Sequence, residues 1–466
     1  MSIDAAPGSF RDPQGKVLEC AGRVFRVLLA PLASFPDTWS AKGAFGRLVA
    51  EGLIWPATPI SAEDVPAELR ALYPDAIGFL EHPRFTPITF PFEWPFELLK
   101  RAALLHLRVH RQLLESGLTL SDGSAYNLQF TGSRPVFLDV LSIEPYGDGQ
   151  PWAGYLQFCE TFLNPLILAA EGSDAWQEMY RGRVRGIAVR EAARELGWWR
   201  AIRRKAFTHV VLNAAAGSST GAAASPGDRK FSRSGLMLLL SSLENCVQSL
   251  QLPGARHGHW GEYENDNSYP PEARAAKRET IEEFIQRKSP SMVLDLGCNT
   301  GEYSEIALKS GATRVVGLER DVEAVKRAVE RSDRLQQRFL PLQMDVLNLT
   351  PSQGWRLRER LSLPERIAAD SVMCLALIHH LVLGAGVPLD VLLPGIVELA
   401  PSGILEFVPR EDPMAARLAG TTQRLHHPYD LATFRKTLAR SARIVNQREL
   451  TPGGRVLVEY QRIANS

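Results

Sequence analysis

The feature that most limits the possible folds of this chain is an apolar run that leads through a glycine turn into a helical pattern. It reads VLDLGCNTGEYSEIA and covers residues 293–307. Gly297 lets the backbone turn tightly and approach a ligand, because it carries no Cβ atom. Gly301 lets the start of the helix pack near the strand. We therefore predict a strand–turn–helix unit of an open α/β sheet, with a ligand at the carboxyl end of the strand.

Strand and helix patterns alternate through the last third of the chain. Such alternation indicates right-handed crossovers and a parallel sheet covered on both faces. The alternation of strands and helices stops near the end of the chain. The pattern there is typical of an antiparallel hairpin, with strands at 442–450 and 455–463 joined by TPGG. The strands predicted before the hairpin are 291–296, 314–318, 339–344, 371–377 and 403–408.

Three carboxylates at predicted strand ends narrow the choice of ligand. A dinucleotide site would place phosphate at the helix N-terminus and favour GxGxxG, but here Asp295 precedes the first glycine. A carboxylate suits an ammonium better than a phosphate, and S-adenosylmethionine (SAM) has an amino-acid end and no phosphate. Glu319 follows 24 residues after Asp295 and can accept hydrogen bonds from ribose hydroxyls. Asp345 ends the next strand, where it can accept one from the adenine amino group.

With these residues, the region of about 260–466 resembles the class I SAM-dependent methyltransferases. The resemblance implies an α/β fold, with a Rossmann-like, seven-stranded, mostly parallel sheet and an antiparallel terminal hairpin. The sequence departs from the commonest glycine-rich pattern of this family at Asn299. Asparagine tolerates a left-handed backbone, so the turn can still form. The resemblance assigns SAM binding to Asp295, Gly297, Cys298, Asn299, Gly301, Glu319 and Asp345.

An aromatic segment precedes the first strand of this region and contains Trp260, Tyr263 and Tyr269. A similar segment covers the cofactor in related enzymes, so the resemblance implies that Tyr263 and Tyr269 contact SAM. The alternative is that these aromatic side chains cap the sheet.

The candidate catalytic residues lie at the ends of the fourth and fifth strands of the region. His379 or His380 could act as a general base, because histidine titrates near neutrality; the alternative is a structural role. Glu406 lies in an apolar strand and needs a partner there, so it either faces the acceptor or pairs with Arg410. Methyl transfer mainly requires alignment, which leaves the acceptor atom open. No residue spacing indicates a metal site.

The length of 466 residues favours two domains. Residues 213–230 are rich in Gly, Ala and Ser and are typical of a flexible linker. We predict an N-terminal α+β domain at 1–212 with a role in substrate specificity, a helical lead-in that covers the cofactor at 231–290, and the methyltransferase domain at 291–466. Within the first domain, 23–29 and 134–142 are predicted strands and 98–116 a helix.

The first domain also resembles kinase-like phosphotransferases over one stretch. Asp122 and Asn127 form a DxxxxN pattern, and Asp139 ends the following apolar strand. In those families such residues orient a hydroxyl group and hold magnesium on ATP. The pattern lacks the usual histidine, which is replaced by Leu120. Two alternatives to a plain methyltransferase therefore stay open: a bifunctional protein whose first domain binds Mg·ATP, and a non-catalytic SAM-binding protein.

Charge and composition argue against several other classes of protein. The net charge of +1, from 53 basic and 52 acidic side chains, disfavours a nucleic-acid substrate and favours a small-molecule acceptor. The five scattered cysteines indicate neither a disulfide framework nor a zinc cluster. No stretch predicts a membrane span or a signal peptide, so we expect a cytoplasmic protein. The overall layout resembles bacterial methyltransferases grouped with a nodulation host-specificity protein; the oligomeric state stays open.

Overall fold

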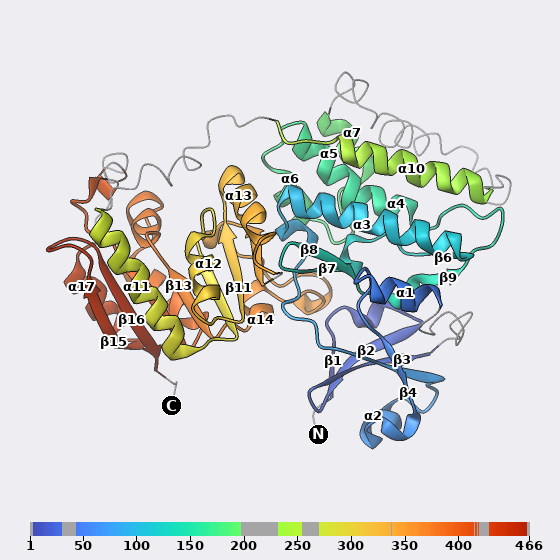
Figure 1. Ribbon diagram of the computed structural model, residues 1–466, viewed down its shortest axis with the longest axis horizontal. Coiled ribbons are helices and arrows are strands. Elements are labelled where there is room, and N and C mark those ends of the chain that lie inside the picture. Colours follow the sequence, from blue (N-terminus) through green and yellow to red (C-terminus); the bar gives the residue numbers. More distant parts are fainter. Residues whose placement is uncertain are drawn as a thin grey trace. The chain divides into compact units, whose positions relative to one another are not determined.

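The computed structural model describes residues 3–29, 43–196, 232–253, 270–336, 338–413, 415–416, 418 and 428–463. The chain divides into two compact units, which are described separately (Figure 1). The first unit comprises Met1–Phe130, Arg134–Gly254 and Pro351–Leu361. The second comprises Thr131–Ser133, Ala255–Thr350 and Ser362–Ser466.

The second unit is built on a seven-stranded sheet in the order β12-β11-β10-β13-β14-β16-β15. Neighbouring strands are parallel except for β16, which runs antiparallel to both β14 and β15. This confirms the prediction of a mostly parallel sheet with an antiparallel terminal hairpin. The strands are β10 (Met292–Leu296), β11 (Arg314–Glu319), β12 (Phe339–Gln343), β13 (Ser371–Cys374), β14 (Ser402–Phe407), β15 (Ala442–Glu449) and β16 (Val456–Arg462).

Helices cover this sheet, as an α/β arrangement requires. Every residue of the central strand β10 is buried, which agrees with a strand that has helices on both faces. One core cluster joins apolar residues of α11 and α12, among them Phe284 and Ala307, to Val293 on β10 and Phe339 on β12. The helices are α11 (Pro271–Lys288), α12 (Glu302–Lys309), α13 (Val322–Ser332), α14 (Leu363–Ile367), α15 (Leu389–Glu398) and α17 (Leu431–Leu438).

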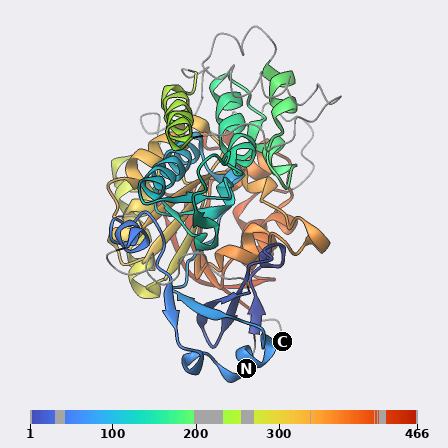
Figure 2. The same cartoon turned by 90° about the vertical axis from the view of Figure 1, so that its right-hand side faces the viewer.

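The first unit begins with a five-stranded antiparallel sheet in the order β1-β2-β3-β5-β4, blue in Figure 2. Alternate residues of β2 and β3, including Leu18 and Phe25, form its core with Leu69 of α2. Its strands are β1 (Ile3–Ala5), β2 (Gly15–Cys20), β3 (Arg23–Leu28), β4 (Thr58–Ile60) and β5 (Gly78–His82). Short pairs follow: β6 (Leu118–Leu120) with β9 (Ile143–Pro145), and β7 (Leu128–Thr131) with β8 (Arg134–Phe137).

Helices make up the rest of the first unit. The longest is α3 (Phe96–Glu115), predicted at 98–116, and α10 (Arg233–Ser249) packs against it. The α10 residues belong to the predicted lead-in of the second domain at 231–290, whereas the first compact unit extends to Gly254. The remaining helices are α1 (Ala44–Ala50), α2 (Ala67–Leu72), α4 (Tyr155–Phe158), α5 (Asn164–Ala170), α6 (Trp176–Arg181) and α7 (Val189–Leu196).

Two predicted strands end earlier than expected. The strand predicted at 134–142 stops at Phe137, because Asp139 accepts a hydrogen bond from the backbone of Leu141 and starts a short 3-10 helix. The strand predicted at 371–377 stops at Cys374, before Ala376 takes a left-handed conformation with φ of 49°. The predicted linker at 213–230 lies outside the described residues. No helix in the described ranges is long and apolar enough to cross a membrane.

Candidate functional site

The glycine turn after β10 has the backbone that its residues predict. Gly297, Asn299 and Gly301 all have positive φ, at 69°, 50° and 81°. The amide of Gly297 donates to the carbonyl of Leu318 at 2.9 Å, which fastens the turn to β11. At Gly301 a Cβ atom would lie 2.5 Å from Cε1 of Phe339, so the helix start and β12 are as close as the glycine allows. Asn299 adopts the left-handed conformation that asparagine tolerates.

Glu319 joins this turn to the end of β11. Its Oε2 accepts a hydrogen bond from the Asn299 amide at 2.9 Å, and Oε1 accepts one from the Asp321 amide at 2.8 Å. Burial raises the pKa of Glu319, and the backbone donors oppose that rise. Each carboxylate oxygen retains capacity for a further hydrogen bond. The carboxylate therefore lies beside the turn, as the assignment of a ribose ligand requires.

Asp295 lies under the turn with 2% of its surface exposed. Its Oδ2 accepts a hydrogen bond from the Ser304 hydroxyl at 2.6 Å. Burial raises the pKa of Asp295 to about 6; the Ser304 hydrogen bond and Lys277 oppose this rise, and Glu319 adds to it. This carboxylate thus changes charge close to the physiological range, in a place where little water reaches it.

Asp295→Asn should therefore change how stability depends on pH. Between about pH 4 and 6 the folded protein keeps a proton on Asp295 that the unfolded chain has released. Stability of the natural protein should fall as the pH rises through this window and then level off. The asparagine variant lacks this loss, so its free energy of unfolding should gain about 2–3 kcal/mol relative to the natural protein between pH 4 and 7. Urea denaturation across that range measures the difference, and a pH-independent difference would contradict the assigned shift.

Asp345 completes the row of carboxylates at the sheet edge. The amide of Met344 donates to the Glu319 carbonyl at 2.8 Å, so the chain leaves β12 beside the end of β11. Asp345 accepts a hydrogen bond from the Leu347 amide at 2.9 Å and lies 3.4 Å from Arg320. Its side chain is 35% exposed and accessible to a ligand. The structure brings the glycine turn, Glu319 and Asp345 together at adjacent strand ends.

Other residues assigned to SAM binding differ in position. The Cys298 side chain is buried in the core, and a Cβ at Gly317 of β11 would lie 2.6 Å from its Sγ. The amide of Cys298 donates to the Leu318 carbonyl at 3.0 Å, and its thiol donates to the Asn299 carbonyl at 3.7 Å. Tyr263 and Tyr269 lie outside the described residues.

The two histidines form a buried pair beyond β13. Their ring centroids are 4.1 Å apart, and His379 is fully buried. Burial lowers the pKa of His379 to about 2 and that of His380 to about 4. A general base works best with a pKa near the operating pH, so this arrangement does not favour either ring as a strong base. Among the described residues neither ring nitrogen of His379 has a hydrogen-bond partner.

Glu406 is held by cations from two other elements. It is fully buried in β14, 2.8 Å from Lys277 on α11 and 3.7 Å from Arg455 next to β16. Arg455 in turn donates from Nε to Asp412 at 2.8 Å. The prediction that Glu406 needs a partner is therefore confirmed, but its partners are Lys277 and Arg455 and not Arg410. Sequence reasoning missed both cations; the one signal was that a carboxylate in an apolar strand needs a partner.

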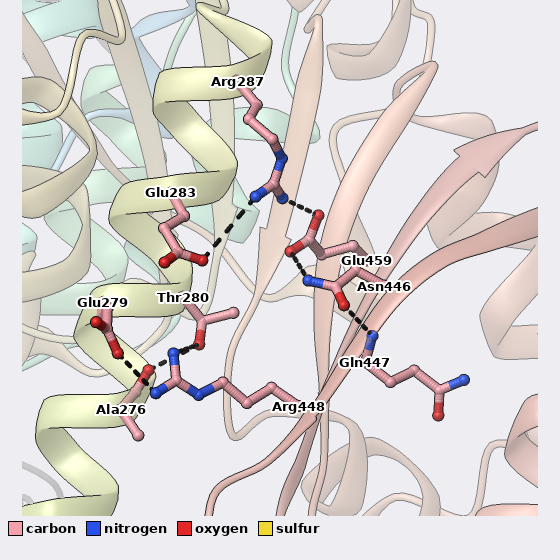
Figure 3. A network of polar contacts seen from close by, with 9 residues as sticks. All are labelled: Ala276, Glu279, Thr280, Glu283, Arg287, Asn446, Gln447, Arg448 and Glu459. Carbon is pink, nitrogen blue, oxygen red and sulfur yellow. Dashed lines mark hydrogen bonds and ion pairs between the residues drawn. The ribbon is translucent and has the colours of Figure 1, made fainter.

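Figure 3 shows polar contacts between α11, the helix that also carries Lys277, and the two strands of the terminal hairpin. Arg287 contacts Glu459 of β16 at 2.5 Å, and Glu459 accepts a second hydrogen bond from Asn446 at 3.0 Å. About two turns earlier in the helix, Glu279 pairs with Arg448 of β15 at 2.6 Å. The helix is therefore fastened to both strands of the terminal hairpin.

A cavity of about 210 Å³ lies where β14 ends and the β15–β16 turn begins. Because β16 runs antiparallel, with Val456 opposite Phe407, this turn meets the carboxyl edge of the sheet. Arg455 and Asp412 contribute charged groups to its wall. The lining residues are Pro270, Ala273, Pro409, Glu411, Asp412, Leu450, Thr451, Gly453, Gly454 and Arg455.

In the first unit, the DxxxxN stretch is ordered around two aspartates. Asp122 accepts a hydrogen bond from the Ser124 amide at 2.7 Å. Burial raises the pKa of Asp122, and this hydrogen bond opposes the rise. Asp139 forms an ion pair with Arg26 of β3 at 2.7 Å, with only 11% of the arginine side chain exposed. In the described part of the chain no three His, Cys, Asp or Glu side chains are grouped to hold a metal.

Comparison with solved structures gives partial matches at low TM-scores. N-methyltransferase NodS from Bradyrhizobium japonicum WM9 is 12% identical, covering 41% of this chain and 96% of that one, with a TM-score of 0.31. WbdD is 18% identical, covering 44% and 43%, with a TM-score of 0.32. Magnesium protoporphyrin IX methyltransferase from Synechocystis PCC 6803, with bound SAH, is 16% identical, covering 44% and 94%, with a TM-score of 0.31. At these values the matches add nothing to what the strand order shows.

The second unit has the seven-stranded fold that the resemblance to class I SAM-dependent methyltransferases implied. No protein-family model matches the chain. The nodulation protein NoeA of Rhizobium meliloti (strain 1021) is 36% identical over 461 residues, which cover 98% of this chain and 95% of that protein. The chain therefore belongs to the family of the nodulation protein NoeA.

Proposed function

We propose that this protein is a SAM-dependent methyltransferase whose second unit transfers a methyl group to a small-molecule acceptor. The observation that carries this proposal is the junction of the glycine turn with Glu319, with Asp345 at the next strand end. This places a tight, glycine-lined backbone and two hydrogen-bond acceptors along one sheet edge. A nucleoside that bears an amino-acid end matches that set of groups.

The residues at the strand ends fit the cofactor in chemistry. Glu319 would accept hydrogen bonds from the ribose hydroxyls and Asp345 one from the adenine amino group. Asp295 and the turn at Gly297 would meet the amino-acid end, where an ammonium favours the ionised form of the carboxyl. SAM, when bound, supplies an electrophilic methyl group on a sulfonium sulfur. The protein then has to align an acceptor with that group and exclude competing water.

The cavity beyond β14 is the acceptor site in this proposal. Its wall carries Arg455 and Asp412, which are held in position by the buried pair of Glu406 and Lys277. Glu406 would then act as a positioning residue, because its carboxylate is engaged by two cations. His379 would contact a ligand through a neutral ring nitrogen and would not act as a strong base.

Glu319→Ala should weaken binding of S-adenosylhomocysteine (SAH) by about 1–3 kcal/mol, because a charged hydrogen-bond acceptor is lost. Isothermal titration measures this, and Glu323→Ala in the first turn of α13, where the side chain is half-buried, is the matched control. The natural protein should also prefer 5′-methylthioadenosine over its 2′,3′-dideoxy analogue, and Glu319→Ala should lose that preference. An unchanged preference would place the ribose elsewhere.

The acceptor itself can be sought with SAM that carries a ¹³C-labelled methyl group, added to metabolite extract. The natural protein should give a product with the corresponding mass shift, and Glu319→Ala should give less of it. SAH binding without any labelled product would favour the alternative of a non-catalytic SAM-binding protein.

Phosphoryl transfer is not assigned to the first unit. The resemblance gives the binding of magnesium to Asn127 and Asp139, and Asp139 is already engaged by the Arg26 guanidinium. The residues present therefore do not fit a magnesium–ATP site as arranged. Titration with Mg·ATP tests this point directly.

A further inference from the structure

One segment of the methyltransferase sequence belongs to the other unit. Residues Pro351–Leu361, here called the strap, lie in sequence between β12 and β13, but they are part of the first unit. The strap is a closed loop. Leu363 donates to the Thr350 carbonyl at 3.0 Å across its base, and Gln353 and Arg360 pair through two backbone hydrogen bonds of 2.8 and 3.1 Å.

The strap is bound to the loop between β1 and β2 through one carboxylate. Nη2 of Arg11 donates to Oε2 of Glu359 at 2.8 Å, and the same oxygen accepts a hydrogen bond from the Trp355 amide at 3.0 Å. The Glu359 side chain is 5% exposed. At Gly8 a Cβ atom would lie 3.2 Å from the Glu359 carbonyl, so the loop lies directly against the strap.

A second set of contacts binds the strap beside Asn127. The guanidinium of Arg360 lies 3.7 Å from the ring centroid of Tyr126, which is cation–π distance. Arg360 also donates to the Val184 carbonyl at 2.6 Å, and the side chain of Gln353 donates to the Arg181 carbonyl at 2.8 Å. The contacts thus come from three separate segments of the first unit.

The tip of the strap has a backbone that needs this support. Gly354, Arg356 and Leu357 have φ of 78°, 54° and 56°. The last two carry Cβ atoms, for which the left-handed region is unfavourable. Such conformations persist where surrounding contacts hold them, and here the contacts on either side come from Gln353 and Glu359.

We propose that the strap is a docking element through which the first unit controls binding of the methyl donor. The chain reaches the strap six residues after Asp345, by way of the 3-10 helix Val346–Asn348 and the buried Thr350. Docking holds this short connection and with it the adenine side of the donor site. Release of the strap loosens the connection, so affinity for the donor falls. This inference rests on the proposed methyltransferase function.

The test uses the full chain with Arg11→Ala, which removes the ion-pair partner of Glu359. The Arg11 side chain is 57% exposed, so its loss leaves no buried cavity. Two quantities are measured: hydrogen exchange of the amides in 351–361, and SAH affinity by isothermal titration. We expect faster exchange in the strap and SAH affinity lower by about fivefold or more. Arg84→Ala is the matched control: Arg84 is 58% exposed and pairs with Glu19 on the same sheet. It should change neither quantity.

Each other result overturns the inference in a distinguishable way. Unchanged exchange in Arg11→Ala would show that the ion pair does not dock the strap. Faster exchange with unchanged SAH affinity would show that docking does not control the donor site. If the natural protein itself fails to bind SAH, the proposed function fails, and control of donor binding fails with it.

Discussion

Lys277→Met should lower the free energy of unfolding by about 3–5 kcal/mol, because it leaves a buried carboxylate without its nearest cation. Glu406 is fully buried, and Arg455, the second described cation near it, lies farther away at 3.7 Å and also pairs with Asp412. Replacing one member of a buried pair costs far more than the pair contributes in the intact protein. Urea denaturation followed by circular dichroism measures the change.

The control for this variant lies in the same helix. Lys288→Met replaces an exposed lysine whose ammonium contacts Gln461, and it should change stability by no more than about 0.5 kcal/mol. Lys277→Met combined with Glu406→Gln should recover part of the loss, since the uncompensated charge is then gone. A double variant as unstable as the single one would mean that Lys277 acts through packing and not through charge.

Gly301→Ala should destabilise the second unit by about 2–4 kcal/mol and weaken SAH binding at least tenfold. Two effects add. The φ of 81° is unfavourable for any residue with a Cβ, and this Cβ would lie 2.5 Å from Phe339, too close for contact. The strand must shift or the turn must open, and either change moves the amides that would meet SAH in the proposed site. Thermal unfolding and SAH titration measure the two effects.

Gly453→Ala separates the two contributions. Gly453 has a similar φ of 66°, but no atom lies within 4 Å of a Cβ built there. It should show the conformational cost alone, about 1–2 kcal/mol, and leave SAH affinity unchanged. Equal losses in the two variants would mean that contact with Phe339 contributes nothing.

The local sequence determined most of the proposed donor site. Gly297 and Gly301 are needed where the backbone turns left-handed, and residues next to each other in the chain set that turn. Alternating strands and helices determine a parallel sheet, and in such a sheet the ends of consecutive strands meet at one edge. Glu319 and Asp345 could therefore be placed beside the turn from their spacing alone. The pattern could not show that the Cys298 side chain packs inward, because that depends on the space beside Gly317.

The tertiary structure decided which charges meet. A carboxylate such as Glu406 in an apolar strand predicts a partner, but the sequence pattern does not identify Lys277 and Arg455 as that partner. The residue type of His379 and His380 predicts a general base, but burial in the folded protein lowers their pKa values. In sequence the strap lies between β12 and β13 of the second unit, whereas its contacts, among them those with Arg11 and Tyr126, place it in the first unit. Backbone conformation follows from neighbours in the chain, whereas charge pairing and burial depend on residues that the fold brings together from far apart.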